Sequence, residues 1–212
     1  DSICGARRER KALAASRGPA VPVQREVTLR SEVSVARYPY LVDHAFYRQR
    51  AGWPSMEDRY PVVPMTMLLA IMMDVARDLC PERVPIGLER VRALRWLAVA
   101  PPVELTITAK VDGDSRVDVT IEGYASGTVE LASVYPAAPR ADATPLAHEA
   151  PPRITAHQLY ADRWMFHGPA YQGVVDLGAL GKDGIRGTLV SLAAKGGLLD
   201  NAGQLLGYWV MQ

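Results

Sequence analysis

The sequence predicts an α+β protein built from two similar lobes, each with an antiparallel sheet around one apolar helix. Two observations lead to this prediction. Apolar residues recur at helical spacing in two distant segments, 68–79 and 198–211, and strict alternation of apolar and polar residues marks several segments between and before them. A stretch with five prolines, residues 136–152, separates the two halves.

The strands of the first half are predicted from alternation. Apolar residues occupy odd positions from Val21 to Val35, which predicts a strand that is bent or broken near its middle. The same alternation predicts strands over 103–111 and 117–121, joined as a hairpin by the turn Asp112-Gly113-Asp114. A further strand is expected over 129–134.

The first helix, predicted from Leu68 to Leu79, is apolar on nearly every side, so we expect it to be buried. Pro81 should end it, because proline lacks the amide hydrogen that a helix interior needs. Residues 45–61 are predicted to form a loop in front of it.

In the second half, Thr155-x-x-Gln158 has the pattern of a helix-capping box. Strands are expected over 174–177 and 185–192, and the second apolar helix over 198–211. One face of this helix carries Leu199, Ala202, Leu206 and Val210. By analogy with the first half, more strands should follow this helix, and none follows in the sequence. The second lobe is therefore expected to be incomplete.

These patterns divide the chain into four parts. Residues 1–18 are expected to form a leader or linker, and 19–135 the N-terminal lobe. Residues 136–153 would be the interlobe linker, and 154–212 the partial C-terminal lobe.

Composition excludes several classes of protein. A hydrophobic content of 49% and a net charge of +1 indicate a globular chain and argue against binding to nucleic acid or a membrane surface. The longest nearly apolar run, Val62 to Met73, is too short to span a bilayer. Two cysteines with no metal spacing fit a reducing compartment. Since His148, His157 and His167 lack the spacing of a zinc helix, no metal site is predicted.

Two residues with proton-transfer chemistry stand in similar places in the two halves. His44 precedes the first apolar helix, and Asp200 opens the second. Each of the two similar lobes would then give one group to a shared site. One lobe would supply a general base and the other a general acid. Residue type alone leaves simpler interpretations open: His44 as a structural histidine, and Asp200 as a helix N-cap.

Three segments, taken together, resemble the dehydratase domain of type I polyketide synthases, which has a double hot-dog fold. They are Asp43-His44 with Val63-Pro64, then Phe166-His167-Gly168-Pro169-Ala170-Tyr171-Gln172, and finally Leu199-Asp200 with Gln204. The interval from His44 to Pro64 is longer than the common family pattern, and Arg48 to Pro61 resembles an insertion. The resemblance covers nearly everything after the basic leader.

The resemblance implies that a β-hydroxyacyl thioester on an acyl carrier protein loses water to give the α,β-unsaturated thioester. His44 would be the base. Asp200 would be the acid, with a pKa raised by burial against Leu198, Leu199 and Trp209. The other expected substrate-site residues are Gln204, Gly52, Pro64, His167, Gly168, Pro169 and Tyr171. For His167, a structural role in the turn before Gly168 is the favoured interpretation.

No cofactor is implied, apart from the phosphopantetheine arm that carries the substrate. The implied partners are an acyl carrier protein, neighbouring synthase domains and a second copy of the chain, in the cytoplasm. Alternatives on the same fold are a product-template-type cyclase, a double-bond isomerase and a catalytically inactive scaffold. A hot-dog thioesterase is a weaker alternative.

Overall fold

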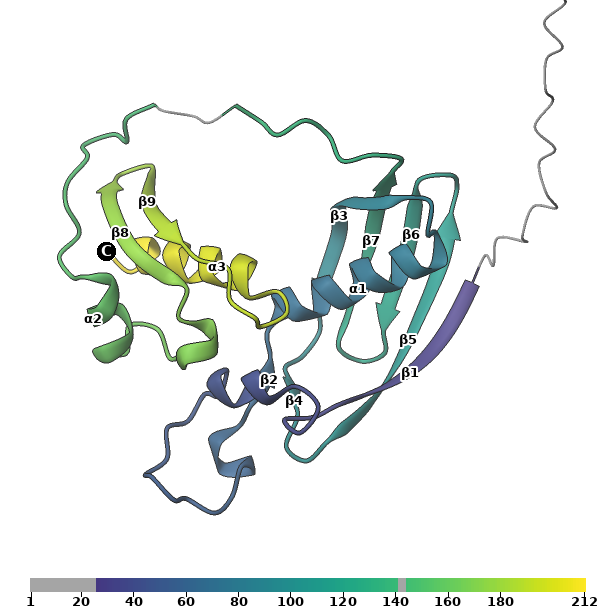
Figure 1. Ribbon diagram of the computed structural model, residues 1–212, viewed down its shortest axis with the longest axis horizontal. Helices are drawn as coiled ribbons and strands as arrows, with labels where there is room; N and C mark the ends of the chain where they lie inside the picture. Colours follow the sequence, from purple (N-terminus) through teal and green to yellow (C-terminus); the bar gives the residue numbers. More distant parts are fainter. Residues whose placement is uncertain (1–25, 141–143) are drawn as a thin grey trace, which may run out of the picture.

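The computed structural model describes residues 26–140 and 144–212 (Figure 1). The predicted leader, residues 1–18, and the start of the first predicted strand lie outside these ranges. The helices and strands in chain order are β1 Glu26–Val33, β2 Val62–Val63, α1 Met65–Leu79, β3 Val84–Ala93, β4 Leu97–Ala98, β5 Val103–Asp112, β6 Arg116–Ile121, β7 Ala125–Ala132, α2 Ala156–Ala161, β8 Val174–Gly181, β9 Gly184–Leu189 and α3 Gly197–Val210.

The first lobe is a five-stranded antiparallel sheet, in the order β1-β5-β6-β7-β3, with α1 lying across one face (Figure 1). The predicted hairpin is confirmed, since β5 and β6 pair from Ile107 opposite Ile121 to Asp112 opposite Arg116. The alternation that predicted these strands places every second side chain toward the helix.

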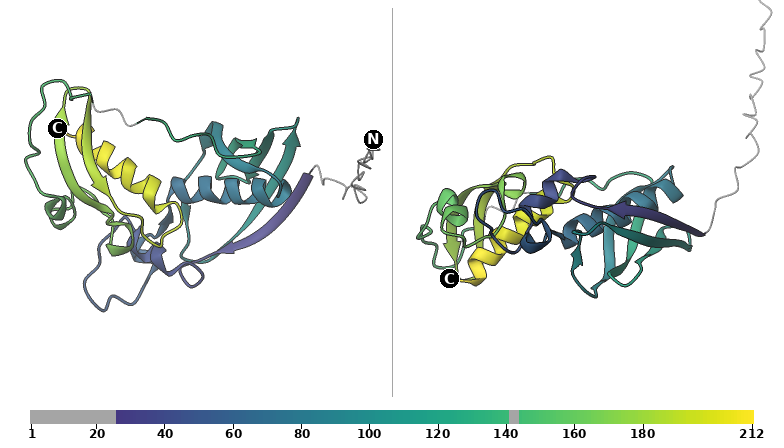
Figure 2. Two further views of the ribbon diagram at one scale, coloured as in Figure 1. Left: turned by 45° about the horizontal axis from the view of Figure 1, so that its top comes forward. Right: turned by 90° about the horizontal axis from the view of Figure 1, so that it is seen from below.

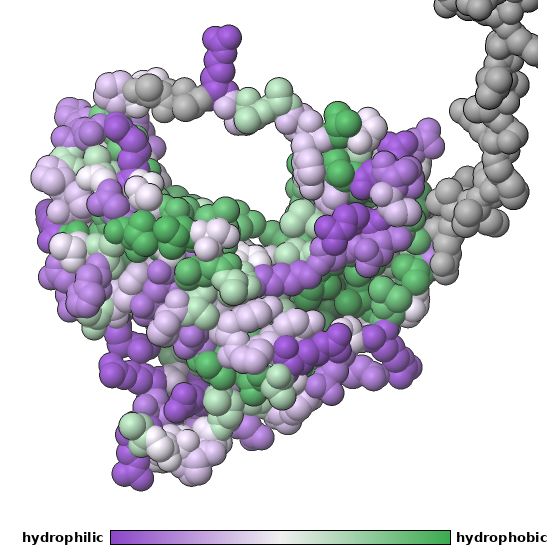
Figure 3. All heavy atoms as spheres, viewed as in Figure 1, coloured by the Kyte–Doolittle hydropathy of each residue, from purple (hydrophilic) through white to green (hydrophobic). Residues whose placement is uncertain are grey.

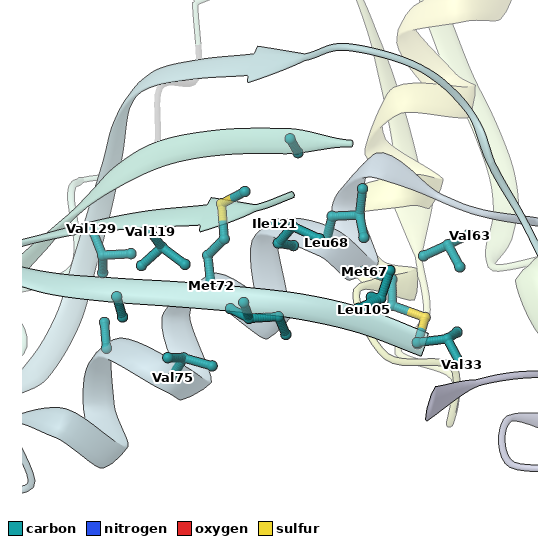
Figure 4. Packing of buried hydrophobic residues seen from close by; sticks show 14 of the residues in the cluster. Val33, Val63, Met67, Leu68, Met72, Val75, Leu105, Val119, Ile121 and Val129 are labelled. Atoms are coloured by element: carbon teal, nitrogen blue, oxygen red, sulfur yellow. The ribbon is translucent and has the colours of Figure 1, made fainter. Parts of the chain in front are cut away.

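The core of this lobe lies between the sheet and α1 (Figure 4). Met67 and Met72 of α1 are fully buried, as are Ile121 and Val129 of the sheet. Burial of one such side chain stabilises the fold by about 1.5–3 kcal/mol, so this contact fixes α1 against the sheet. The helix ends at Leu79, two residues before Pro81, as the sequence predicted.

The strand β3 was not predicted from the sequence. It contains Pro85 and Gly87, two residues that disfavour strands, and its pairing with β7 shifts register twice. The strand lies at the edge of the sheet, where proline and charged residues are tolerated because one side needs no partner strand. Arg90 of this strand is exposed and pairs with Asp118 of β6.

The second lobe holds α2, the two-stranded sheet of β8 and β9, and α3. The capping box is confirmed, because Thr155 caps α2 and exchanges hydrogen bonds with Gln158. The end of the proline-rich segment packs on this lobe through the bridge between Ala150 and Leu180. A small core joins α2, β8 and α3. It is formed around Leu159, Leu177 and Tyr208.

The apolar face predicted for α3 is not the buried one. Leu199, Leu206 and Val210 are 53%, 54% and 70% exposed, and this part of the second lobe shows a hydrophobic surface (Figure 3). The buried stripe is instead Gly197, Asn201, Gln204 and Tyr208. In the described residues only β8 and β9 form the sheet beside α3, so the opposite face of the helix is uncovered. No helix in the described residues is long and apolar enough to cross a membrane.

The two lobes meet where the N-terminal ends of α1 and α3 come together (Figures 1 and 2). Gly196, which precedes α3, has a φ of +76°, and a side-chain carbon on it would lie 2.5 Å from the backbone carbon of Thr66. Glycine is therefore required for this approach. Next to it, Lys195 pairs with Asp74 of α1.

Candidate active site

A cavity of about 270 Å³ lies at the junction of the two lobes. It contains His44 from the first lobe and Asp200 from the second, the two residues predicted to share a site. Its lining residues are His44, Pro64, Met65, Thr66, Trp96, Met165, Phe166, His167, Leu199, Asp200, Gly203 and Gln204.

His44 follows the short 3-10 helix Pro39–Asp43 and is buried. Its Nδ1 lies 2.9 Å from the carbonyl oxygen of Val62. Because a carbonyl oxygen only accepts hydrogen bonds, Nδ1 carries the hydrogen and Nε2 keeps its lone pair in the neutral ring. Burial, together with the neighbouring His167, lowers the pKa of His44 to about 4. At neutral pH this side chain is therefore an unprotonated imidazole, the form that a general base needs.

Asp200 lies in the first turn of α3, which begins at Gly197 with Gly196 as its N-cap. The N-cap interpretation of Asp200 is therefore wrong. Of the predicted apolar wall, Leu199 lines the cavity with Asp200, but Leu198 and Leu199 are about half exposed. The third predicted residue, Trp209, donates a hydrogen bond to the carbonyl oxygen of Gly181. Burial raises the pKa of Asp200, but the hydrogen bonds from His167 and Gln204, together with the charge interactions with His167 and His44, outweigh burial and lower the pKa overall. The expected raised pKa is thus not found in the substrate-free site.

His167 lies beside both predicted catalytic residues. Its Nε2 is 3.2 Å from Oδ2 of Asp200, and its ring centroid is 5.1 Å from that of His44. Phe166 stacks on the ring at 4.1 Å. The structural role that was favoured for His167 does not describe this position, because the side chain itself is in the site.

Gln204 joins Asp200 to the rest of the second lobe. Its Nε2 donates to Oδ2 of Asp200 at 2.8 Å and to the carbonyl oxygen of Tyr171 at 3.0 Å. Its Oε1 accepts from the hydroxyl of Tyr160 at 3.0 Å. Gln204 is buried, so these bonds hold the carboxyl group of Asp200 in one orientation.

Asp43, the neighbour of His44, fastens the two lobes at the site. Its carboxylate accepts a hydrogen bond from the amide of Ala170 at 2.8 Å, and its carbonyl accepts one from the amide of Gly168 at 2.7 Å. A side-chain carbon on Gly168 would lie 2.4 Å from the Asp43 carboxylate. The Gly-Pro turn is therefore held against the first lobe, which places His167 beside His44.

The remaining predicted residues lie in different places. Pro64 lines the cavity and precedes α1. Gly168 and Pro169 line a second cavity, which His167 also lines. Tyr171 is fully buried, with its ring centroid 5.3 Å from that of His44, and it is not among the residues that line the catalytic cavity. Gly52 is an exposed loop residue that lines neither cavity.

Sequence reasoning did not find several residues of the cavity wall. Trp96, which is 60% exposed, and Met165 are apolar residues in no motif or periodic pattern that would mark them as part of a site. Thr66 has a buried hydroxyl with no partner among the described residues. Its position after Pro64, just before a predicted buried helix, is the one feature of the sequence that could have indicated a place near the site.

The sequence predicted no metal site, yet His44, His167 and Asp200 place one nitrogen or oxygen each within 4.8 Å of one another. The Oδ2 oxygen of Asp200 already accepts hydrogen bonds from two N–H donors. A cation at that oxygen would face the hydrogen of His167. In this arrangement the three side chains form a hydrogen-bonded cluster in which Oδ2 of Asp200 is already used as an acceptor.

Comparison with known proteins concerns the fold. No family model and no curated protein matches the chain. Among solved structures, the dehydratase domain from the CurF module of curacin polyketide synthase matches with a TM-score of 0.66 and 13% identity, over 92% of this chain and 74% of that one. The dehydratase domain of a mycocerosic acid synthase-like polyketide synthase matches with a TM-score of 0.61 and 14% identity, over 85% of this chain and 66% of that one.

An N-terminal dehydratase from the difficidin assembly line also matches, with a TM-score of 0.60 and 16% identity, over 89% of this chain and 71% of that one. The chain therefore has the double hot-dog fold of polyketide synthase dehydratase domains. It spans about two thirds to three quarters of the length of these structures.

Proposed function

We propose that this domain removes water from a β-hydroxyacyl thioester carried by an acyl carrier protein, giving the α,β-unsaturated thioester. The observation that supports this most directly is the convergence of His44 and Asp200, from two lobes, in one cavity. The fold of dehydratase domains supports the same reaction class.

In the proposed reaction, Nε2 of His44 takes the proton from the α-carbon, next to the thioester carbonyl. Negative charge then builds on the carbonyl oxygen. The amides of Met65 and Thr66 begin α1 at the cavity wall, and no backbone hydrogen bond from them is found in the described residues, so they are suited to stabilise that oxygen. Asp200 protonates the β-hydroxyl, which leaves as water, and the double bond forms between the α- and β-carbons.

The carrier arm is proposed to approach from the second cavity, which has a volume of about 340 Å³. Arg48, Arg59 and Arg163 line it. It shares Met165, Phe166 and His167 with the catalytic cavity. A phosphopantetheine arm carries a phosphodiester, and arginine is the side chain best suited to bind phosphate oxygens. An acyl carrier protein in the cytoplasm, with neighbouring synthase domains, is the partner that this proposal requires.

The test is incubation of the protein with a panel of β-hydroxyacyl pantetheine thioesters, followed by mass spectrometry for loss of water. His44→Phe and Asp200→Asn should each lower the rate by about 10²–10⁴-fold, while His157→Phe, at an exposed histidine of α2, should not change it. Absence of dehydration across the panel would contradict the proposal. An aromatic cyclised product or a shifted double bond would favour the cyclase or isomerase instead.

A further inference from the structure

We propose that His167 is a positioning residue which, together with Gln204, gives the two oxygens of Asp200 separate roles: Oδ2 accepts hydrogen bonds, and Oδ1 delivers the proton to the substrate. This inference rests on the proposed dehydration, and it assigns to His167 a task that the pair of His44 and Asp200 does not perform.

The first step of the argument concerns the hydrogen between His167 and Asp200. Nε2 of His167 and Oδ2 of Asp200 are 3.2 Å apart and are both in largely buried side chains, 7% and 13% exposed. An ionised carboxylate has no hydrogen to give, so Nε2 must be the donor in the substrate-free site. Gln204 donates to the same oxygen at 2.8 Å.

The second step concerns the other oxygen. None of the described residues donates a hydrogen bond to Oδ1 of Asp200. When Asp200 is protonated, its hydroxyl oxygen must act as a donor, and an oxygen that faces two N–H groups is poorly suited to carry that hydrogen. The proton therefore resides on Oδ1, and Oδ1 is the oxygen left available to the β-hydroxyl of a substrate.

The third step is that the ring of His167 is held rigidly enough to act in this way. Phe166 stacks on it with an interplanar angle of 22°. The turn that carries it is tied to the first lobe by Asp43, through the amides of Gly168 and Ala170. Gln172 further donates to the carbonyl oxygen of His167 at 2.9 Å. The direction of Nε2 toward Asp200 is thus determined by both lobes.

The proton inventory of one turnover is balanced by these groups. Asp200 is a carboxylate in the substrate-free site, so Oδ1 first takes one proton from solvent. His44 then gains the α-proton, Oδ1 of Asp200 gives its proton to the departing hydroxyl, and water is the leaving group. His44 finally releases its proton to solvent, so no net proton is consumed. The bonds from His167 and Gln204 stabilise the carboxylate left after proton donation, which strengthens Asp200 as an acid.

Ionisable groups from several elements surround Asp200. They are His44 after the helix Pro39–Asp43, His167 and Tyr171 from the Gly-Pro turn and its 3-10 helix, and Tyr160 of α2. The hydrogen bond of His167 is the largest of the influences that lower the pKa of Asp200. Its removal should therefore raise the pKa of Asp200.

The test compares His167→Phe, which removes the donor, with His167→Gln, which keeps an N–H group near the position of Nε2. The exposed His157→Gln is the matched control. We expect His167→Phe to lower kcat about 10–100-fold, with KM changed less than kcat, and to move the Asp200 limb of the kcat profile to higher pH. His167→Gln should recover most of the rate and return that limb toward its original pH. A His167→Gln variant as slow as His167→Phe, or an unmoved limb in His167→Phe, would overturn the proposal.

A second measurement does not depend on activity. Carboxyl ¹³C NMR of aspartate-labelled protein follows the titration of Asp200 without substrate, with Asp200→Asn used to assign the signal. We expect its midpoint to rise in His167→Phe and to return toward the wild-type value in His167→Gln. If the wild-type protein dehydrates no substrate but the midpoint moves in this way, the proposed function fails and the role of His167 in setting Asp200 stands. If the midpoint is the same in all three proteins, the role of His167 fails whatever the activity.

Discussion

At the scale of single residues, the site depends on two side chains, one held neutral and the other held ionised by its surroundings. His44 is neutral because burial and His167 disfavour its charged form. Asp200 is ionised when no substrate is bound because N–H donors outweigh its burial. For the proposed reaction Asp200 must first gain a proton, which it then gives to the substrate, while the neutral His44 accepts one.

The substitution Gln204→Ala tests how much of this direction comes from Gln204. It removes the acceptor for the Tyr160 hydroxyl, which keeps only the bond from the amide of Val174, and the side-chain donor to the carbonyl of Tyr171. We therefore expect the free energy of unfolding to fall by about 1–3 kcal/mol. The rate should fall less than in Asp200→Asn, since Gln204 orients the acid and does not give the proton. Urea unfolding and initial rates measure both effects.

Gln158→Ala is the control for this measurement, because Gln158 is exposed and lies in the capping box of α2. It should lose stability without a specific effect on rate. A Gln204→Ala protein with the stability and rate of the wild type would show that the carboxyl group is oriented without Gln204.

At the scale of elements, the site depends on the starts of two helices being brought together. The start of α1 supplies the cavity wall at Met65 and Thr66, and the first turn of α3 supplies Asp200. Gly196 lets these two ends approach, because there is no room for a side chain against the backbone of Thr66. Helix packing and proton-transfer geometry therefore depend on the same glycine.

Gly196→Ala is expected to separate the helix ends and to lower both stability and activity. Its positive φ alone should cost about 1–3 kcal/mol, and the clash with Thr66 should add to this cost. Gly113→Ala is the matched control, because Gly113 also has a positive φ, +69°, and has open space around it. Thermal unfolding and turnover should show a loss of activity for Gly196→Ala only. An equal loss of stability in both variants would contradict a role for the close approach.

At the scale of the whole molecule, burial of a neutral histidine links stability to pH. The unfolded chain binds a proton at His44 near pH 6.5, whereas the folded protein does so only near pH 4. The free energy of unfolding should therefore fall as pH is lowered from about 6.5 to 4, by about 3 kcal/mol from this group. The lowered pKa of Asp200 acts in the same direction at still lower pH.

Urea unfolding of the wild type and His44→Phe at several pH values between 7 and 4 measures this dependence. The variant should show a shallower loss of stability between pH 6.5 and 4, because it lacks the group that titrates there. Parallel curves for the two proteins would mean that His44 is not the residue responsible.

The uncovered face of α3 is a second property of the whole molecule. Exposed apolar surface of this kind favours self-association. We expect the 212-residue chain to associate in solution, and Leu206→Lys with Val210→Lys to reduce this association. Light scattering against protein concentration measures it, with Ser115→Lys as a control that adds charge at an exposed turn. A wild-type protein that stays monomeric at high concentration would contradict the prediction.

The sequence by itself determined the local elements and the identity of the two central groups. Alternation predicted β5 and β6, and helical spacing with Pro81 predicted α1, because these signals depend on neighbouring residues. Resemblance to dehydratase domains selected His44 and Asp200. The edge strand β3 was not predicted, because its pairing with β7 overrides the weak strand preference of Pro85 and Gly87.

Only the tertiary structure decided how these groups act on one another. His167 and Asp200 are far apart in the sequence, and no local pattern reports that Nε2 and Oδ2 lie 3.2 Å apart. The direction of the Asp200 pKa shift follows from this contact and from Gln204, and it is opposite to the direction expected from apolar neighbours in the sequence. Which face of α3 is buried was also decided by the elements that pack on it, since a helix with apolar residues on several sides does not specify its own buried face.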